Sequence, residues 1–487
     1  MNRMKLIAFF LSAITTVGFA QDYTHPREMN LPKSNFSRPN PNNYRLALEN
    51  GLVAFVVEDR RVPLVTITAL IRAGTASDRR QGSAEALTYA MRHEGPIGET
   101  KESFQDKLRS MAANFQVLMG PEITQISLNV PSEDAWDALD LMSSLLQKPQ
   151  INQFVIETLQ RISAPKTDPS ASAIEESGPV LYEGSLTSAV ERFKAILFAD
   201  HPYGLKPTSE DYQKLKLSRI KDFHKKYFIP GNTAIALSGD FSTNVAREKL
   251  TESFRNWKSR SIPKQKNARN VRAPKIRHVY TYPSDKLQAW VVLGHELPFL
   301  PLKDQAALQV MNYILGGGHF DTRLFRETRD KRGLTNDDSG FPEINWYGPG
   351  YYTFRTYGRP EVINLLVELT LQEIKRIRTE PVSEEELFVA KNALADGVFQ
   401  MGFENGHTTA LTFAEEWLRY NNHHESASYV DRIRKVTKKD VLSAAKKFLH
   451  PERMQLVLMG PIEKVLSSNY SEGDFSIREF GEMAAGK

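Results

Sequence analysis

Apolar positions along this chain switch between a two-residue and a 3.6-residue spacing, which predicts strands interleaved with amphipathic helices. The stretch "YRLALENGLVAFVVEDRRVPLVTITALIRAG" holds two β-rich runs on either side of the turn residues "ENG", which indicates a hairpin. Helical patterns follow over residues 82–92 and 101–113, and "EITQISLNV" then alternates as a strand. "SEDAWDALDLMSSLLQ" begins with a Ser cap and continues as an amphipathic helix. The order predicts an α+β fold with helices packed on a sheet.

The pattern then repeats. "RHVYTYPSDKLQAWVVLGHEL" opens on strands as residues 44–72 do, and "YYTFRTYG" with "RPEVINLLVELTLQEIKRI" matches the strand–helix step of residues 123–147. "KKDVLSAAKKFLHPERMQLVLMGPI" mirrors "LSRIKDFHKKYFIPGNTAIALSGDF", because each is an amphipathic helix, a Phe, a Pro and an apolar strand ending in Gly. We expect two homologous halves, residues 44–256 and 277–487, joined by a polar, basic linker over 257–276.

The N-terminus predicts export. "MNRMK" is a short basic region, and the apolar run "LIAFFLSAITTVGFA" closes on small residues before Gln21, so residues 1–20 have the pattern of a secretory signal peptide. An uncleaved membrane anchor is the alternative, but the apolar run is short for a membrane span. Residues 21–43 are rich in Pro and Asn without periodicity, and we expect an extended N-terminal arm. The expected location is the bacterial periplasm.

Composition limits the number of domains and the kinds of site that this chain can have. The 487 residues are too many for one compact core, so they call for two or more domains. Cys is absent, which removes disulfides, thiol catalysis and thiolate metal sites. A formal net charge of +5 is small for this length and is not a nucleic-acid signature.

The stretch "GSAEALTYAMRHEG", residues 82–95, has the spacing of a metal-site helix. Glu85, Thr88 and Tyr89 stand at i, i+3 and i+4 and therefore share one helical face, but they offer a carboxylate, a hydroxyl and a phenol. His93 and Glu94 are adjacent, a spacing that does not converge on one point. His423 and His424 are also adjacent and lack a further partner at metal spacing.

Several separated segments together resemble the M16 metallopeptidases, the pitrilysin, insulin-degrading and mitochondrial processing peptidase family. They are "NGLVAFVVEDRRVPLVTITALIRAGTASD", "HPYGLKPTSEDY", "FHKKYFIPGNTAIALSGD", "LGGGHFDTRLFRETRDKRGL" and "PVSEEELFVAKNALADG", in this order between about residues 44 and 465. The resemblance implies two LuxS- and MPP-like α/β sandwich halves that form a half-clam around a peptide chamber.

Active members of that family carry an H-x-x-E-H helix whose two His bind zinc and whose Glu activates water. Glu85, Thr88 and Tyr89 occupy those positions here. A phenol with a pKa near ~10 is a poor zinc ligand at neutral pH, and a Thr hydroxyl is no general base. The family's third ligand falls near Ser163 or Ala164; Asp168 is close but follows Pro165. We therefore expect no metal in this chain.

In the second half, the resemblance places Arg329 and Asn336 where related proteins hold the peptide with an Arg and a Tyr. Arg329 retains a fork of donors, whereas Asn336 has a shorter side chain. A surface charge beside Asp330 and Lys331 is an equal alternative for Arg329. Gly316, Gly317 and Gly318 either contact substrate, as a Gly-rich loop does in the non-catalytic processing peptidase subunit, or form a helix-ending turn. "HPYG" at 201–204 is expected to be structural.

These observations predict an M16 peptidase-like protein without its own zinc site, the non-catalytic, peptide-binding subunit of a periplasmic zinc-dependent peptidase. The expected partners are a catalytic M16 subunit or a second copy, and unfolded peptide docking as an added strand. No cofactor is expected here, since the zinc would belong to the partner. A non-proteolytic peptide-binding or scaffold protein is the alternative. An active metallopeptidase with unconventional ligands is a third reading.

Overall fold

The computed structural model describes residues 36–78, 82–163, 185–264 and 268–486. The expected signal peptide and the first part of the arm lie outside the described residues; the last part, Pro41–Asn43, forms a short 3-10 turn. Within the described ranges, no helix has the length and apolar character needed to cross a membrane.

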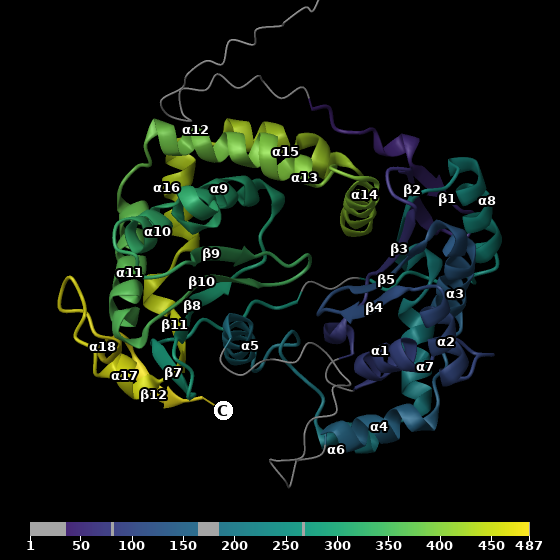
Figure 1. Ribbon diagram of the computed structural model, residues 1–487, viewed down its shortest axis with the longest axis horizontal. Helices are drawn as coiled ribbons and strands as arrows, with labels where there is room; N and C mark the ends of the chain where they lie inside the picture. The colour runs from purple at the N-terminus through teal and green to yellow at the C-terminus, as the bar shows by residue number, and fades with distance from the viewer. Residues whose placement is uncertain (1–35, 79–81, 164–184, 265–267, 487) are drawn as a thin grey trace, which may run out of the picture. The chain divides into compact units, whose positions relative to one another are not determined.

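Two mixed six-stranded sheets carry the fold (Figure 1). The first has the order β1 (Arg45–Ala47), β2 (Val53–Glu58), β6 (Thr233–Gly239), β3 (Leu64–Ile71), β5 (Thr124–Pro131) and β4 (Asn114–Met119). The second has the order β12 (Glu482–Ala485), β7 (His278–Pro283), β11 (Gln455–Gly460), β8 (Ala289–Leu297), β10 (Gly350–Gly358) and β9 (Asp338–Glu343).

Strand directions confirm the predicted internal repeat. β2 runs parallel to β6, and β7 runs parallel to β11, while the strands beyond them are antiparallel in both sheets. The outermost strands differ, since β1 is antiparallel to β2 whereas β12 is parallel to β7. The "ENG" turn connects β1 and β2 as the predicted hairpin. The fold is therefore the expected α+β arrangement of two similar halves.

Helices of the first half are α1 (Ser83–His93), α2 (Lys101–Ser110), α3 (Ala135–Gln147), α4 (Gln153–Ser163), α5 (Leu186–Leu197), α6 (Ser209–Lys214), α7 (Leu217–Tyr227) and α8 (Thr243–Phe254). Those of the second half are α9 (Leu302–Asn312), α10 (Arg323–Phe325), α11 (Ile363–Thr379), α12 (Glu384–Asn392), α13 (Phe399–Met401), α14 (Gly406–Tyr420), α15 (His424–Lys435), α16 (Lys438–Phe448), α17 (Ile462–Leu466) and α18 (Ile477–Phe480). Most of them pack on one face of their own half's sheet.

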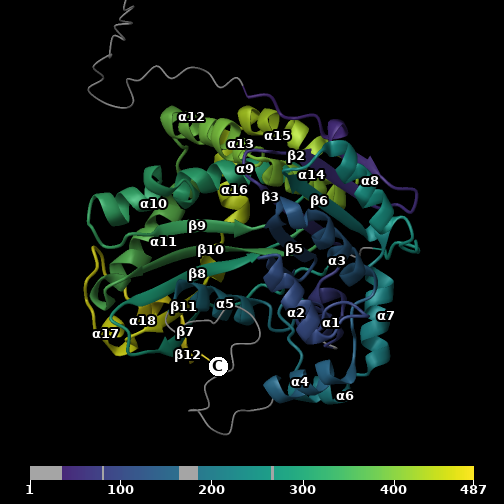
Figure 2. The same cartoon turned by 45° about the vertical axis from the view of Figure 1, so that its right-hand side comes forward.

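Helices α5 and α14 are exchanged between the halves. α14 packs on β2 and β6 of the first sheet, and α5 packs on β8 and β11 of the second (Figures 1 and 2). The two helices occupy equivalent places in the repeat, because each precedes the amphipathic helix and buried strand that close its half. Each sheet thus has its second face covered by the opposite half.

Alternation along β2 explains why this exchange is needed. Ala54 and Val56 point into the core formed with the first half's own helices, whereas Val53, Phe55 and Val57 point to the face that α14 covers. A strand that is apolar on both sides is stable in water only when both faces are covered. The second sheet follows the same rule at Leu456, Val457 and Leu458 of β11.

Polar contacts fix α14 at both ends. The Asp59 carboxylate of the first half accepts a 2.8 Å hydrogen bond from the Gly406 amide at the helix N-terminus. At the other end, the Arg72 guanidinium of the first half donates to the Leu418 carbonyl. An anion at the N-terminus and a cation at the C-terminus both complement the helix dipole. A hydrogen bond from Arg61 lowers the pKa of Asp59, which keeps this anchor ionised.

One predicted helix start is wrong. Ser132 does not cap the helix, because residues Ser132–Asp134 form a 3-10 turn and α3 begins at Ala135 without a side-chain cap. The Ser132 hydroxyl instead donates to Asp240 at 3.4 Å, a partner 108 residues away. Sequence spacing does not reveal such a long-range competitor for the hydroxyl.

Because α5 and α14 each cover the sheet of the opposite half, we expect truncation of a buried ring on either helix to destabilise the protein strongly. Phe413 of α14 and Phe193 of α5 are 0% exposed, so we expect Phe413→Ala and Phe193→Ala each to lower the free energy of unfolding by about 3–5 kcal/mol in urea denaturation. Phe388→Ala is the matched control, since Phe388 is 66% exposed and should change it by no more than about 0.5 kcal/mol. Values for the two core variants equal to that of the control would contradict the account.

Candidate functional site

The helix that carries Glu85, Thr88 and Tyr89 is α1, and its start is fixed by two features. Gly82 has a left-handed φ of 78°, and a Cβ there would come within 2.9 Å of the Tyr212 ring, so only glycine suits the position. The buried Asp78 carboxylate then accepts hydrogen bonds from the amides of Ser83 at 2.5 Å and Ala84 at 3.1 Å. The predicted helix over residues 82–92 is confirmed as Ser83–His93.

Thr88 and Tyr89 are engaged in contacts of the helix and the core. The Thr88 hydroxyl donates to the Ala84 carbonyl one turn earlier at 2.9 Å and lies 3.5 Å from the Met119 sulfur of β4. Tyr89 is buried, and its ring centroid is 4.4 Å from that of His93. Neither side chain therefore presents a metal ligand or a general base to an open site.

Glu85 is the most perturbed of the three positions. Burial, with a smaller contribution from the nearby Asp78 carboxylate, raises the pKa of Glu85 to about 7. The carboxyl group is therefore substantially protonated at neutral pH, which makes it a weak cation ligand. Burial is also the main cause that raises the pKa of Tyr212, with the negative charge of Glu85 adding to it.

The residues around α1 do not fit a zinc ion. Throughout the described parts of the chain, no three His, Asp or Glu side chains gather at metal-binding distance. Glu94 accepts a 3.0 Å hydrogen bond from Asn152, and Ser163, the last residue of α4, donates to the Gln160 carbonyl at 3.2 Å. Ala164 and Asp168 lie outside the described residues. No catalytic step through zinc follows from this donor set.

Arg329 and Asn336 have different surroundings. Arg329 is in a π-helical turn, Arg326–Asp330, where its guanidinium stacks over the rings of Phe325 at 4.8 Å and Phe320 at 5.2 Å. Asn336 is an exposed residue of the loop before β9. A guanidinium held by two aromatic rings keeps its donors available to a carbonyl or carboxylate.

The three glycines are explained by close packing. Gly316 lies in a π-helical turn after α9, and a Cβ there would meet the Gly340 amide of β9 at 2.7 Å. A Cβ on Gly317 would collide with the Asn312 side chain, and one on Gly318 would lie 2.6 Å from the Tyr313 ring. Close packing therefore accounts for a glycine at each of the three positions, and contact of this turn with substrate stays a prediction.

The "HPYG" stretch contacts Glu122, a residue that the sequence did not single out. His201 accepts from the Tyr203 amide at 3.2 Å and bonds the Arg269 carbonyl at 2.8 Å, which fits a structural role. The Tyr203 hydroxyl donates to Glu122, whose carboxylate also accepts from the amides of Trp346 at 2.6 Å and Tyr347 at 2.8 Å. Glu122 connects loops of the two halves, and its partners are 81 to 225 residues away.

The edge strand next to α1 is the other feature absent from the sequence prediction. β4 is the outermost strand of the first sheet, and among the described strands it pairs with β5 alone. Thr88 contacts it at Met119, and Arg92 donates from α1 to the Val117 carbonyl. Leu118 on this strand is 51% exposed. An edge strand with an exposed apolar side chain is a surface to which an extended peptide adds.

Comparison with known proteins finds M16 peptidases similar to this chain in sequence, and solved structures that share its fold. The family model described as the Peptidase M16 inactive domain matches residues 214–394. A Helicobacter pylori protein named "Non-peptidase homolog YmxG" is 24% identical over 345 residues, covering 69% of this chain and 75% of that protein. An uncharacterized zinc protease of Rickettsia felis is 21% identical over 407 residues, covering 82% and 93% respectively.

A solved structure supports the fold. The crystal structure of a peptidase M16 inactive domain from Pseudomonas fluorescens superposes with a TM-score of 0.69 at 22% identity, covering 86% of this chain and 97% of that one.

Because the pKa of Glu85 is raised, we expect its carboxyl group to lower the stability of the folded protein at high pH. The unfolded carboxyl ionises near ~4.3. Between that pH and the folded-state pKa of about 7, the native state binds more protons than the unfolded state. The free energy of unfolding therefore falls as the pH rises through this range, and the full loss of stability is reached above pH 7. We expect Glu85→Gln to raise the free energy of unfolding at pH 8 by about 1–3 kcal/mol more than at pH 4. Glu102→Gln, at an exposed position of α2, is the control in urea denaturation at both pH values. An equal effect of Glu85→Gln at the two values would contradict the burial of this carboxyl group.

Proposed function

This chain belongs to the M16 peptidase family, and we propose that it is a peptide-binding member that performs no zinc-dependent cleavage itself and assists a catalytic M16 partner. The observation that carries the proposal is the state of Thr88, at the position where active relatives hold the general base. Its hydroxyl bonds to its own helix at Ala84. Glu85 and Tyr89 do not restore the missing chemistry, because one is substantially protonated at neutral pH and the other is packed in the core.

Peptide binding is the part of the family's chemistry that these residues can still perform. The open edge of β4 offers backbone groups for an added strand, and the exposed Leu118 offers an apolar contact. Arg329, held by aromatic rings, offers donors for a peptide carbonyl or carboxylate. The Helicobacter pylori relative is named a non-peptidase homolog, which supports the proposed lack of cleavage by this chain.

The place of action that we propose is the periplasm, reached through the signal pattern of residues 1–20. The partner would be a catalytic M16 subunit that brings the zinc. A non-proteolytic scaffold protein remains the second candidate, favoured by the short Asn336 where related proteins have a Tyr. The two candidates differ in one respect, since a scaffold would not change the activity of a zinc-bearing relative.

Activity assays separate the candidates. We expect the purified protein alone to leave an unstructured fluorogenic peptide intact, and a mixture with a zinc-bearing M16 protein from the same organism to cleave it faster than that protein does alone. Chelator-sensitive cleavage by this protein alone would overturn the proposal. An unchanged rate in the mixture would favour the scaffold candidate.

A substitution on the edge strand tests peptide binding itself. Leu118→Lys places a charge on β4, so we expect it to weaken binding of an unstructured peptide by about tenfold in fluorescence anisotropy. Leu287→Lys is the matched control, because Leu287 is 89% exposed in the β7–β8 turn and should leave the affinity unchanged. Equal affinities of the two variants would place peptide binding elsewhere.

A further inference from the structure

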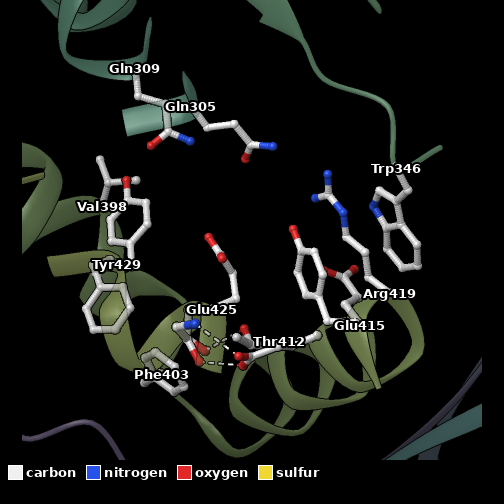
Figure 3. A pocket seen from close by; sticks show the side chains of 15 residues that line it. Gln305, Gln309, Trp346, Val398, Phe403, Thr412, Glu415, Arg419, Glu425 and Tyr429 are labelled. Atoms are coloured by element: carbon white, nitrogen blue, oxygen red, sulfur yellow. Dashed lines mark hydrogen bonds between the residues drawn. The ribbon is translucent and has the colours of Figure 1, made fainter. Parts of the chain in front are cut away.

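A cavity of about 330 Å³ is lined by residues of the second half. Side chains from α9, α14 and α15 line it, together with residues 398–403 and Trp346 (Figure 3). Its size falls in the range of small-molecule sites, which are mainly apolar with a few polar groups that orient the ligand. The proposed function uses none of its residues.

Four polar atoms at this cavity are buried and have no hydrogen-bond partner among the described residues. They are the Arg419 Nε, the Tyr420 hydroxyl, the Glu425 Oε2 and the Gln309 Oε1. Figure 3 shows the ends of Gln309, Arg419 and Glu425 turned toward the same space. Buried polar groups are nearly always hydrogen-bonded, so four at one cavity indicate that a polar occupant completes them.

Three carboxylates line the cavity, those of Glu415, Glu416 and Glu425. Glu416 accepts a 3.0 Å bond from the Ser426 amide and lies 3.6 Å from the Arg38 guanidinium, so its charge is already matched. Glu425 pairs with Arg432 through Oε1 and leaves Oε2 unpaired. Among these three side chains, the Glu425 Oε2 is the oxygen that is buried without a partner, whereas Glu415 is exposed and stands one turn before Arg419 on α14.

The basic side is the Arg419 guanidinium, whose charge interacts with those of the nearby Glu415 and Glu425. Arg419 stacks on the rings of Trp346 at 5.7 Å and Tyr420 at 5.0 Å, and it forms no ion pair with any described side chain. Burial raises the pKa of Tyr420 to about 12, which keeps its hydroxyl a donor. The Arg419 Nε and the Tyr420 hydroxyl are thus two donors, and the Glu425 Oε2 and the Gln309 Oε1 are two acceptors. The stacked rings of Phe399 and Tyr429, with centroids 5.4 Å apart, form an apolar wall.

We propose that this cavity binds a small zwitterion, an α-amino acid or a dipeptide, with its ammonium group at Glu425 and Gln309 and its carboxylate at Arg419 and Tyr420. The aromatic wall suits an apolar side chain of the ligand. The volume admits such a molecule but not a folded protein element. This site is independent of the proposed peptide-binding edge, so either could fail without the other.

Calorimetry with four probes tests the proposal on the purified full chain. L-leucine and the dipeptide Leu-Leu carry both charged ends, L-leucinamide lacks the carboxylate, and N-acetyl-L-leucine lacks the ammonium group. We expect at least one of the two zwitterions to bind and both blocked forms to bind at least about tenfold more weakly. Comparing leucine with Leu-Leu then tells an amino acid site from a dipeptide site.

Two variants test which residue binds each charged end of the ligand, and they distinguish a loss of binding from a loss of folding. Arg419→Gln should remove the preference for the zwitterion over leucinamide, and Glu425→Gln should remove its preference over N-acetyl-leucine. A general folding defect would not abolish one preference and leave the other. Glu248→Gln and Arg255→Gln, at exposed positions on the first half, are the matched controls and should change neither preference.

Two outcomes would overturn the proposal. The first is no binding of any probe by the wild-type chain up to about 10 mM, which would mean that water alone fills the cavity. The second is equal affinity for the zwitterions and both blocked forms, which would mean that the charged ends are not recognised.

Discussion

Each sheet of this protein has two apolar faces, and a helix from the opposite half covers one of them. Strand β2 shows the constraint most directly, because Phe55 and its neighbours at alternate positions contact α14 rather than the first half's own helices. The Asp59 and Arg72 contacts fix α14 at its two ends, and the Glu122 carboxylate connects the loops nearby. Neither half can bury both faces of its sheet without the other, so the two halves form one structural unit.

The packing of the fold also explains how α1 is held in place. α1 is fixed by Asp78, Gly82 and core packing, and none of these depends on a bound ion. The Thr88 hydroxyl bonds to its own helix at Ala84, and the Tyr89 ring packs against His93. The structure therefore places an edge strand, β4, beside α1, whereas Glu85, Thr88 and Tyr89 form no zinc ligand set.

Periodicity and repeats predicted much of this architecture. The hairpin, the two halves, the position of α1 and most strands follow from local patterns, because apolar alternation and turn residues act over short distances. The Ser132 cap was wrong since a distant Asp240 binds that hydroxyl. The helix exchange, the Glu122 contacts and the cavity beside Arg419 were not predictable, because each joins residues whose proximity arises only after both halves have folded. The roles of Arg329 and the Gly316 turn in substrate contact stay predictions.

The central claim is that this chain has no zinc chemistry of its own, and direct measurement of bound metal tests it most simply. The protein, purified without chelator and dialysed against buffer containing zinc, is analysed by inductively coupled plasma mass spectrometry. The account predicts far less than one zinc per chain, because Glu85, Thr88 and Tyr89 do not form a ligand set. One tightly bound zinc per chain, lost on Glu85→Gln, would contradict it.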